Sequence, residues 1–122
     1  MKYYDLTESA EEDFREAKTW SKARWGKELT ARYFSDLHTS AEHAALYRRG
    51  ASISIELTED ITLYGYSARE HYLIYIPVAD DRITIVALIR QGRDIVTILR
   101  SRQHRIQNEL EEIQDKVKQN DN

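Results

Sequence analysis

The spacing of apolar residues changes once along this chain of 122 residues, close to Gly50. Between Thr7 and Ala45, apolar side chains recur every three or four residues, which is the spacing of one helix face. Between residues 51 and 90 they alternate or form short β-branched runs, as strands do. Helices followed by a run of strands predict an α+β fold in layers, and the length predicts a single core.

The helical part is predicted to follow a short strand over residues 2–6. Thr7 is a suitable N-cap for a helix that ends at Trp25-Gly26 and carries an apolar face made of Ala10, Phe14, Ala17 and Ser21. A second helix over residues 27–45 carries the stripe Leu29, Tyr33, Leu37 and Ala41 (or Ala44). The short connection between them predicts an antiparallel helical hairpin.

The strand part contains three clear segments, at residues 62–67, 71–76 and 82–90. Residues 53–57 also alternate, and are compatible with either a strand or an extended loop. Asp80-Asp81 predicts a tight turn, and Ile85 to Ile89 is apolar on both faces, as in a central or doubly covered strand. We therefore expect a three-strand antiparallel meander, joined by the N-terminal strand and covered on one face by the hairpin.

The C-terminal part is predicted to be one helix, from an N-cap at Asp94 to about Lys118. Its apolar seam consists of Leu99, Ile106, Leu110, Ile113 and Val117. Such a helix is about 36 Å long, about as long as the domain is wide. We expect this seam to serve self-association or another partner, with a frayed end as the alternative. The expected boundaries are a domain at 1–100 and a helical extension at 101–122.

Composition limits the possible functions. The chain has no cysteine, which excludes disulfides and thiolate chemistry, and it has neither a 20-residue apolar run nor a signal-peptide pattern, so we expect a cytoplasmic protein. The formal charge is −3. Six arginines nevertheless lie between residues 82 and 105 with a single acid, Asp94. They are either a solvated face or an anion- and partner-binding patch, and we expect no sequence-specific nucleic-acid binding.

Five stretches of the chain stand out by their residues and order: Trp25-Gly26 with Ala31, Tyr33 and Leu37; Ala44-Ala45-Leu46 with Arg49-Gly50; Ser67-Ala68-Arg69 with His71 and Ile74-Tyr75; Asp80-Asp81-Arg82-Ile83 with Ile85; and Arg93-Asp94-Ile95. Over residues 2–100, they resemble the ParE branch of the ParE/RelE superfamily of bacterial toxins. The chain departs from the branch at Ala87 and Arg90, where an arginine and a histidine are usual.

This resemblance implies the toxin of a type II toxin-antitoxin system, which inhibits DNA gyrase by binding it and is neutralised by a cognate antitoxin. The region from Glu70 to Leu99 would carry the function, with target-binding residues Arg69, His71, Arg90, Arg93 and Arg100. Antitoxin contacts would fall on Trp20, Phe34 and Leu37, with Phe34 as an exposed anchor and Trp20 beside it. Alternatively, Phe34 and Trp20 are both ordinary core aromatics. Such an inhibitor requires no catalytic residue, cofactor or metal, and the group His38, Glu42 and His43 lacks the zinc-binding pattern.

Two other functions are compatible with the same resemblance. RelE-type members are ribosome-dependent endoribonucleases, which need a base, an acid and a phosphate-binding cation. Here no Tyr follows Tyr75, and the only later His is His104. The third alternative is a non-toxic family member that acts as an assembly partner, which the residues Ala87 and Arg90 suggest.

Overall fold

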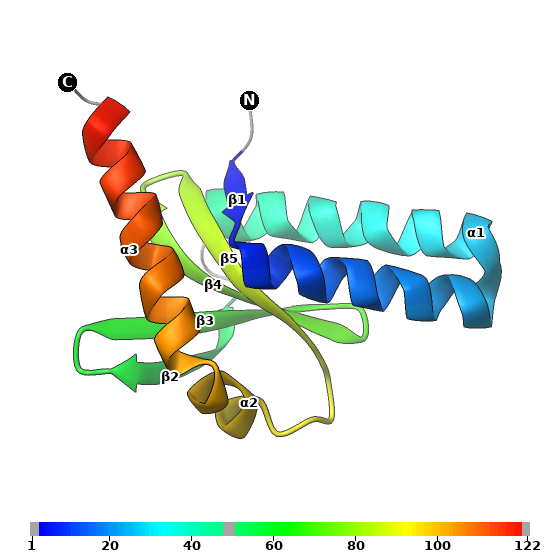
Figure 1. Ribbon diagram of the computed structural model, residues 1–122. Helices are drawn as coiled ribbons and strands as arrows, with labels where there is room; N and C mark the ends of the chain where they lie inside the picture. Colours follow the sequence, from blue (N-terminus) through cyan, green and yellow to red (C-terminus); the bar gives the residue numbers. More distant parts are fainter. Residues whose placement is uncertain (1–2, 48–50, 121–122) are drawn as a thin grey trace.

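The computed structural model describes residues 3–47 and 51–120, without the side chains of residues 52 and 114–120. A five-stranded sheet forms its centre, in the order β1-β5-β4-β3-β2 (Figure 1). The elements are β1 (Tyr4–Leu6), α1 (Glu8–Tyr47), β2 (Ala51–Thr58), β3 (Ile61–Ala68), β4 (His71–Ala79), β5 (Arg82–Arg90), α2 (Ile95–Ser101) and α3 (Gln103–Asn120). The α+β class, with its N-terminal strand, helical hairpin, antiparallel meander and C-terminal helix, is confirmed. Residues 53–57, for which the sequence left strand and loop open, belong to β2, a fourth meander strand.

The helical hairpin is α1 itself, which turns back at Gly26, where φ is 84° and ψ is 170°. Its two halves run side by side, and the turn end projects beyond the sheet (Figure 1). The predicted N-cap is confirmed, because the Thr7 hydroxyl accepts a hydrogen bond from the Ala10 N–H at 3.1 Å.

The predicted apolar face of the second half of α1 is confirmed at Leu37 and Ala41 and is wrong at Leu29. Leu29 is 55% exposed, whereas Phe34 is only 5% exposed. The buried stripe of the second half instead begins at Thr30 and continues through Phe34, Leu37, Ala41, Ala44 and Ala45. The sequence did not indicate this stripe, because its first member, Thr30, is polar and yet fully buried. Phe34 is therefore a core aromatic and not an exposed anchor.

Strand β5 lies between β1 and β4 and is buried from Ile83 to Ile89, which confirms the prediction of a central, doubly covered strand. Strand β1 pairs with it in parallel, and β4 pairs with it antiparallel. A register shift occurs where Ile74 faces Ala87 and Tyr75 faces Ile85. Consequently Ile83 and Ile85 join the core under the hairpin, and Ala87 and Ile89 join the core on the other face.

The C-terminal tail forms two helices, α2 and α3, with Arg102 between them, instead of one continuous helix. The predicted cap is confirmed, because Asp94 accepts a hydrogen bond from the Thr97 N–H. Leu99, Ile106 and Leu110 pack with Ile55, Leu57, Leu63 and Val86 on the sheet face away from the hairpin.

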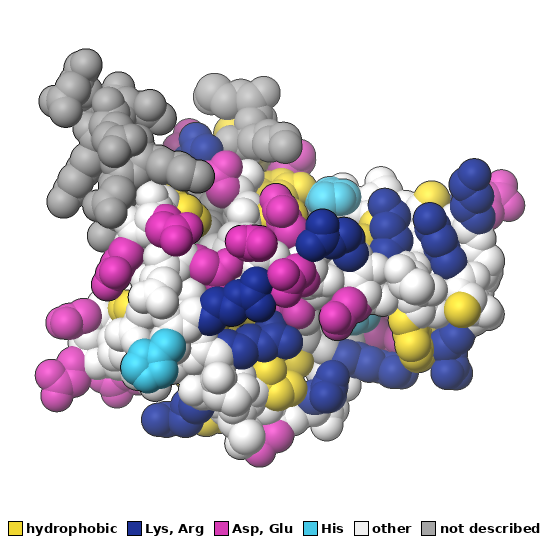
Figure 2. Space-filling view, in the orientation of Figure 1, with side chains coloured by type: hydrophobic (Ala, Val, Ile, Leu, Met, Phe, Trp, Pro, Cys, Tyr) yellow, Lys and Arg dark blue, Asp and Glu magenta, His cyan; other side chains and the backbone are white. Residues whose placement is uncertain are grey.

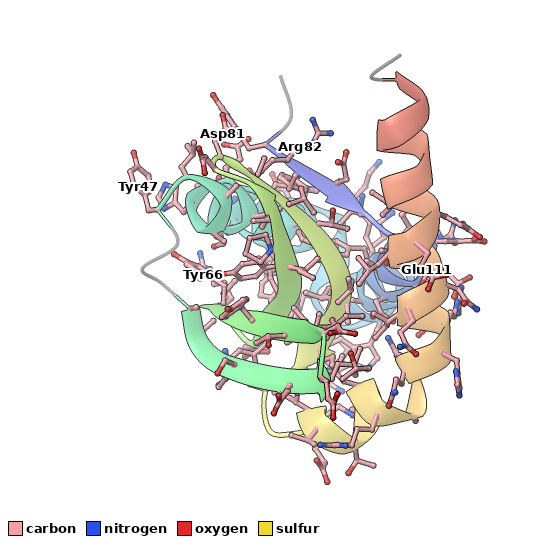
Figure 3. The ribbon with its side chains drawn as sticks, turned by 90° about the vertical axis from the view of Figure 1, so that its left-hand side faces the viewer. Tyr47, Tyr66, Asp81, Arg82 and Glu111 are labelled. Carbon is pink, nitrogen blue, oxygen red and sulfur yellow. The ribbon has the colours of Figure 1, made fainter. Side chains whose placement is uncertain are left out.

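The self-association seam predicted for the tail is therefore wrong at Leu99, Ile106 and Leu110, which are core residues at 0%, 0% and 8% exposure. Ile113 is half-buried, and the side chain of Val117 lies outside the described residues. The break at Arg102 lets the tail follow the twisted sheet, so that α2 and α3 cover the sheet face away from the hairpin. Glu111 marks the outward side of α3 (Figure 3).

Candidate target-binding cleft

A cleft of about 290 Å³ lies where β1 stops and leaves the end of β5 without a neighbouring strand on that side. The last bond between β1 and β5 joins the Thr7 N–H to the Ile85 carbonyl at 3.0 Å, because the chain enters α1 at this point. The cleft is lined by Asp13, Glu16, Ala17, Trp20, His71, Leu88, Ile89, Arg90, Arg93, Ile98 and Arg102.

Asp13 holds the floor of the cleft together. Its Oδ2 accepts hydrogen bonds from the Leu88 N–H at 3.1 Å and from Arg102 Nη1 at 2.8 Å. The carboxylate thus satisfies a backbone donor that has no strand partner, and at the same time ties α1 to the tail. Sequence reasoning missed this role, since Asp13 looks like one more surface acid in the first turns of a helix.

Trp20 forms a wall of the cleft between two guanidinium groups. The carbon Cζ of Arg90 lies 4.8 Å from the centroid of the indole ring, and that of Arg24 lies 4.6 Å from it. The indole is 36% exposed, so the exposure expected for Trp20 is present. Cation–π contacts of this kind orient the Arg90 head group without neutralising its charge.

His71 lies at the inner end of the cleft, opposite Arg90 across the β4–β5 ladder, and is 7% exposed. Its Nδ1 is 2.5 Å from the hydroxyl oxygen of Tyr33, and the same oxygen accepts the Glu70 N–H at 3.1 Å. The Tyr33 hydrogen is therefore available to donate to a neutral imidazole.

The pKa shifts of His71 and Tyr33 agree with a neutral imidazole that accepts the Tyr33 hydrogen. Burial, followed by the nearby charge of Arg90, lowers the pKa of His71. Burial also raises the pKa of Tyr33. Both groups are thus held neutral at neutral pH, and Arg90 and Arg93 supply positive charge in the cleft. Neither arginine forms an ion pair with a described residue.

Gln91 fixes the edge of the cleft and was also missed by sequence reasoning. Its side-chain amide donates to the Ser67 hydroxyl at 2.8 Å and to the carbonyls of Arg69 and His71 at 3.0 and 3.2 Å. These bonds hold the β3–β4 turn against the end of β5. A single glutamine after an apolar strand carries no sequence signal for such a role.

The structure brings together only part of the predicted target-binding set. His71, Arg90 and Arg93 line the cleft, whereas Arg69 and Arg100 do not. Arg69 has a φ of 57° in the β3–β4 turn and pairs with Asp36 of α1. Arg100 lies exposed on α2. Of the predicted antitoxin contacts, Trp20 is at the surface, and Phe34 and Leu37 are buried.

No group of three potential metal ligands gathers among the residues that the structure describes. Within the same part of the chain, no helix combines the length and the apolar character needed to cross a bilayer.

Comparison with known proteins places the fold in a family. The family model for the ParE toxin of the type II toxin-antitoxin system parDE matches residues 4–95. This chain belongs to that toxin family. A solved structure described as the chromosomal ParDE toxin-antitoxin system from P. aeruginosa has the same fold, with a TM-score of 0.55 and 13% identity. The match covers 74% of this chain and 96% of that one. A search of curated protein sequences found no match.

Proposed function

We propose that this toxin acts by binding DNA gyrase in the bacterial cytoplasm, and that the cleft between α1, β5 and α2 contacts the target. The observation that carries the proposal is the group of Trp20, Arg90 and Arg93 at one open cleft. Two cations without ion pairs beside an exposed indole are suited to binding a carboxylate or phosphate on a macromolecular surface. Arg69 and Arg100 would contact the target around the rim.

The proposal is tested with purified toxin and gyrase, by measuring supercoiling and the accumulation of cleaved DNA. Arg90→Glu/Arg93→Glu should raise the concentration needed for inhibition at least tenfold, because two attractive charges become repulsive. Lys116→Glu/Lys118→Glu makes the same change of net charge in the tail and should inhibit like the wild type. Full inhibition by a folded Arg90→Glu/Arg93→Glu variant would show that the cleft does not bind the target.

We further propose that a cognate antitoxin neutralises the toxin by covering exposed parts of the hairpin, including Trp20, and the free edge of β2. Strand β2 ends the sheet and therefore offers unpaired backbone groups for strand addition. Phe34 and Leu37 would support this surface from below. Coexpression with the product of a neighbouring small antitoxin gene should restore growth, and Trp20→Ala should weaken the complex.

One observation favours ribonuclease activity as the second candidate. The neutral His71, bonded to Tyr33 and next to Arg90, provides a group capable of proton transfer beside a phosphate-binding cation. Expression of the chain alone separates the candidates. A ribonuclease would cut messenger RNA, whereas a gyrase inhibitor would produce gyrase-linked DNA breaks. His71→Gln would abolish message cleavage if His71 is the base. Unchanged growth would instead favour a non-toxic assembly partner.

A further inference from the structure

A second cluster of positive charge in this acidic chain lies at the projecting end of the hairpin. Residues 17–32, here called the basic arm, contain five Lys and Arg residues and one acid, Glu28. The cations are Lys18, Lys22, Arg24, Lys27 and Arg32, and all five are exposed. Figure 2 shows Lys and Arg side chains gathered along the hairpin, whereas Asp and Glu dominate the surface towards α3.

The arm cations differ in their pairing from four arginines elsewhere in the chain. Arg69, Arg82, Arg102 and Arg105 form ion pairs with Asp36, Asp5, Asp13 and Glu12. Among the described residues, no ion pair involves a cation of the arm. Lys18 and Arg24 instead lie near the rings of Phe34 and Trp20. The arm therefore keeps its full charge towards solvent.

The arm is continuous with the cleft through Trp20, since this indole contacts both Arg24 of the arm and Arg90 of β5. A continuous chain of contacts thus runs from Arg24 of the arm through Trp20 to Arg90 of the cleft. Lys18 and Lys22 are separated by one helical turn, about 6 Å along the axis. Phosphates lie about 3.4 Å apart along the axis of each strand of a duplex, so the two ammonium groups can contact different phosphates.

The composition of the arm favours a polyanion over an acidic protein. Protein interfaces have an apolar centre from which lysine is depleted. The large apolar side chains exposed on the arm are Trp20, which is flanked by two arginines, and Leu29. A regular array of phosphates satisfies scattered, mobile lysines without any apolar contact.

We propose that the basic arm binds duplex DNA through its phosphates, without regard to sequence. This inference goes beyond gyrase inhibition and does not depend on it. For a toxin whose target carries DNA, such an arm would add a second attachment next to the cleft and raise the effective concentration at the complex.

The test uses the full chain and two labelled 20-base-pair duplexes of unrelated sequence. Binding is followed by fluorescence anisotropy from 25 to 200 mM NaCl, over which the Debye length falls from about 20 Å to about 7 Å. Both duplexes should bind alike, with a dissociation constant of about 10⁻⁶ to 10⁻⁴ M near 0.15 M salt. Lys18→Gln/Lys22→Gln should reduce the slope of log K against log salt by about 1.8, or about 0.9 per lost phosphate contact. The matched variant Lys116→Gln/Lys118→Gln should keep the wild-type slope.

A second arm variant, Lys27→Gln/Arg32→Gln, guards against a local folding defect in the first half of α1. The proposal is overturned if the wild type does not bind duplex at the lowest salt, or if the tail variant loses as much affinity as the arm variants. It is also overturned if poly-glutamate binds more tightly than duplex, because the arm would then accept acidic protein segments. The gyrase assay is scored separately, so DNA binding without gyrase inhibition would reject only the proposed function.

Discussion

Individual side chains in this toxin make contacts that cannot be inferred from the residues next to them in the sequence. His71 is the clearest case, since its imidazole is buried between Tyr33 of α1 and Arg90 of β5. The Tyr33 hydroxyl joins the hairpin to the β3–β4 turn by contacting both His71 and the Glu70 N–H. A pair of neutral groups thereby connects the cleft to the core under the hairpin.

The lowered pKa of His71 predicts a loss of stability in mild acid. The unfolded chain binds a proton at His71 near its ordinary pKa of 6.5, whereas the folded chain binds it only at lower pH. The free energy of unfolding should therefore fall as the pH drops from about 7 through 6.5 and below. Urea unfolding between pH 5.5 and 7.5 measures this effect, and His71→Gln should show a flatter profile than the wild type. Parallel profiles for the two proteins would contradict the assignment.

Thr84 carries a buried hydroxyl without a hydrogen-bond partner among the described residues, and its side chain is fully buried in β5. Valine has the same shape and no polar group to desolvate, so Thr84→Val should stabilise the fold by about 1 kcal/mol. Chemical denaturation measures the change. Thr62→Val, at an exposed position of β3, is the matched control and should stay within about 0.5 kcal/mol of the wild type. A destabilised Thr84→Val would indicate that the hydroxyl is satisfied in solution.

At the level of elements, the hairpin depends on one backbone conformation. Gly26 combines a φ of 84° with a ψ of 170°, a region that side-chain-bearing residues rarely enter. This turn sets the direction of the second half of α1, and with it the positions of Trp20 and the basic arm. The arm beyond the sheet is packed with small polar residues such as Ser21 and Thr30, whose hydroxyls have no partner in the described structure.

Gly26→Ala should consequently destabilise the protein by about 1–3 kcal/mol. A Cβ at this position meets no atom within 4 Å, so the effect would come from backbone strain alone. Thermal melting compared with Thr19→Ala, an exposed change in the same half of α1, provides the measurement and its control. Equal melting temperatures for both variants would show that the turn relaxes without cost.

At the level of the whole molecule, both faces of the sheet are covered by the chain itself. The hairpin covers one face, and α2 with α3 covers the other. Contacts between α3 and the first turns of α1 tie the two layers together, because Arg105 pairs with Glu12 and Glu109 accepts hydrogen bonds from the N–H and hydroxyl of Ser9. The tail is thus part of the folded core although the family model ends at residue 95.

Removal of residues 103–122 should therefore destabilise the fold. The deletion uncovers the apolar face that Ile106 and Leu110 bury, each contributing about 1.5–3 kcal/mol. We expect a lower melting temperature and binding of a hydrophobic dye. Removal of residues 114–122 alone keeps both side chains and should have little effect. Unchanged melting of the shorter chain would restore residues 101–122 to the status of an independent extension.

The sequence by itself determined the elements and their order. Local signals sufficed for Thr7 as a cap, Gly26 as the hairpin turn, Asp94 as the start of α2 and the apolar run of β5 as a central strand. Such features depend on residues close together in the chain, so their physics can be read from spacing and residue type. The arginines of the cleft were found in the same way, because charge clusters are visible in composition.

Only the tertiary structure decided which faces meet. Phe34 and Leu29 exchanged their expected places, and the tail seam turned inward, because burial is settled by distant partners on the sheet. The same reason separates the arginines, since acids brought from α1 neutralise Arg102 and Arg105 and leave Arg90 and the basic arm unpaired. Charge pairing and side-chain contact act through space, and the sequence records them only as separate residues.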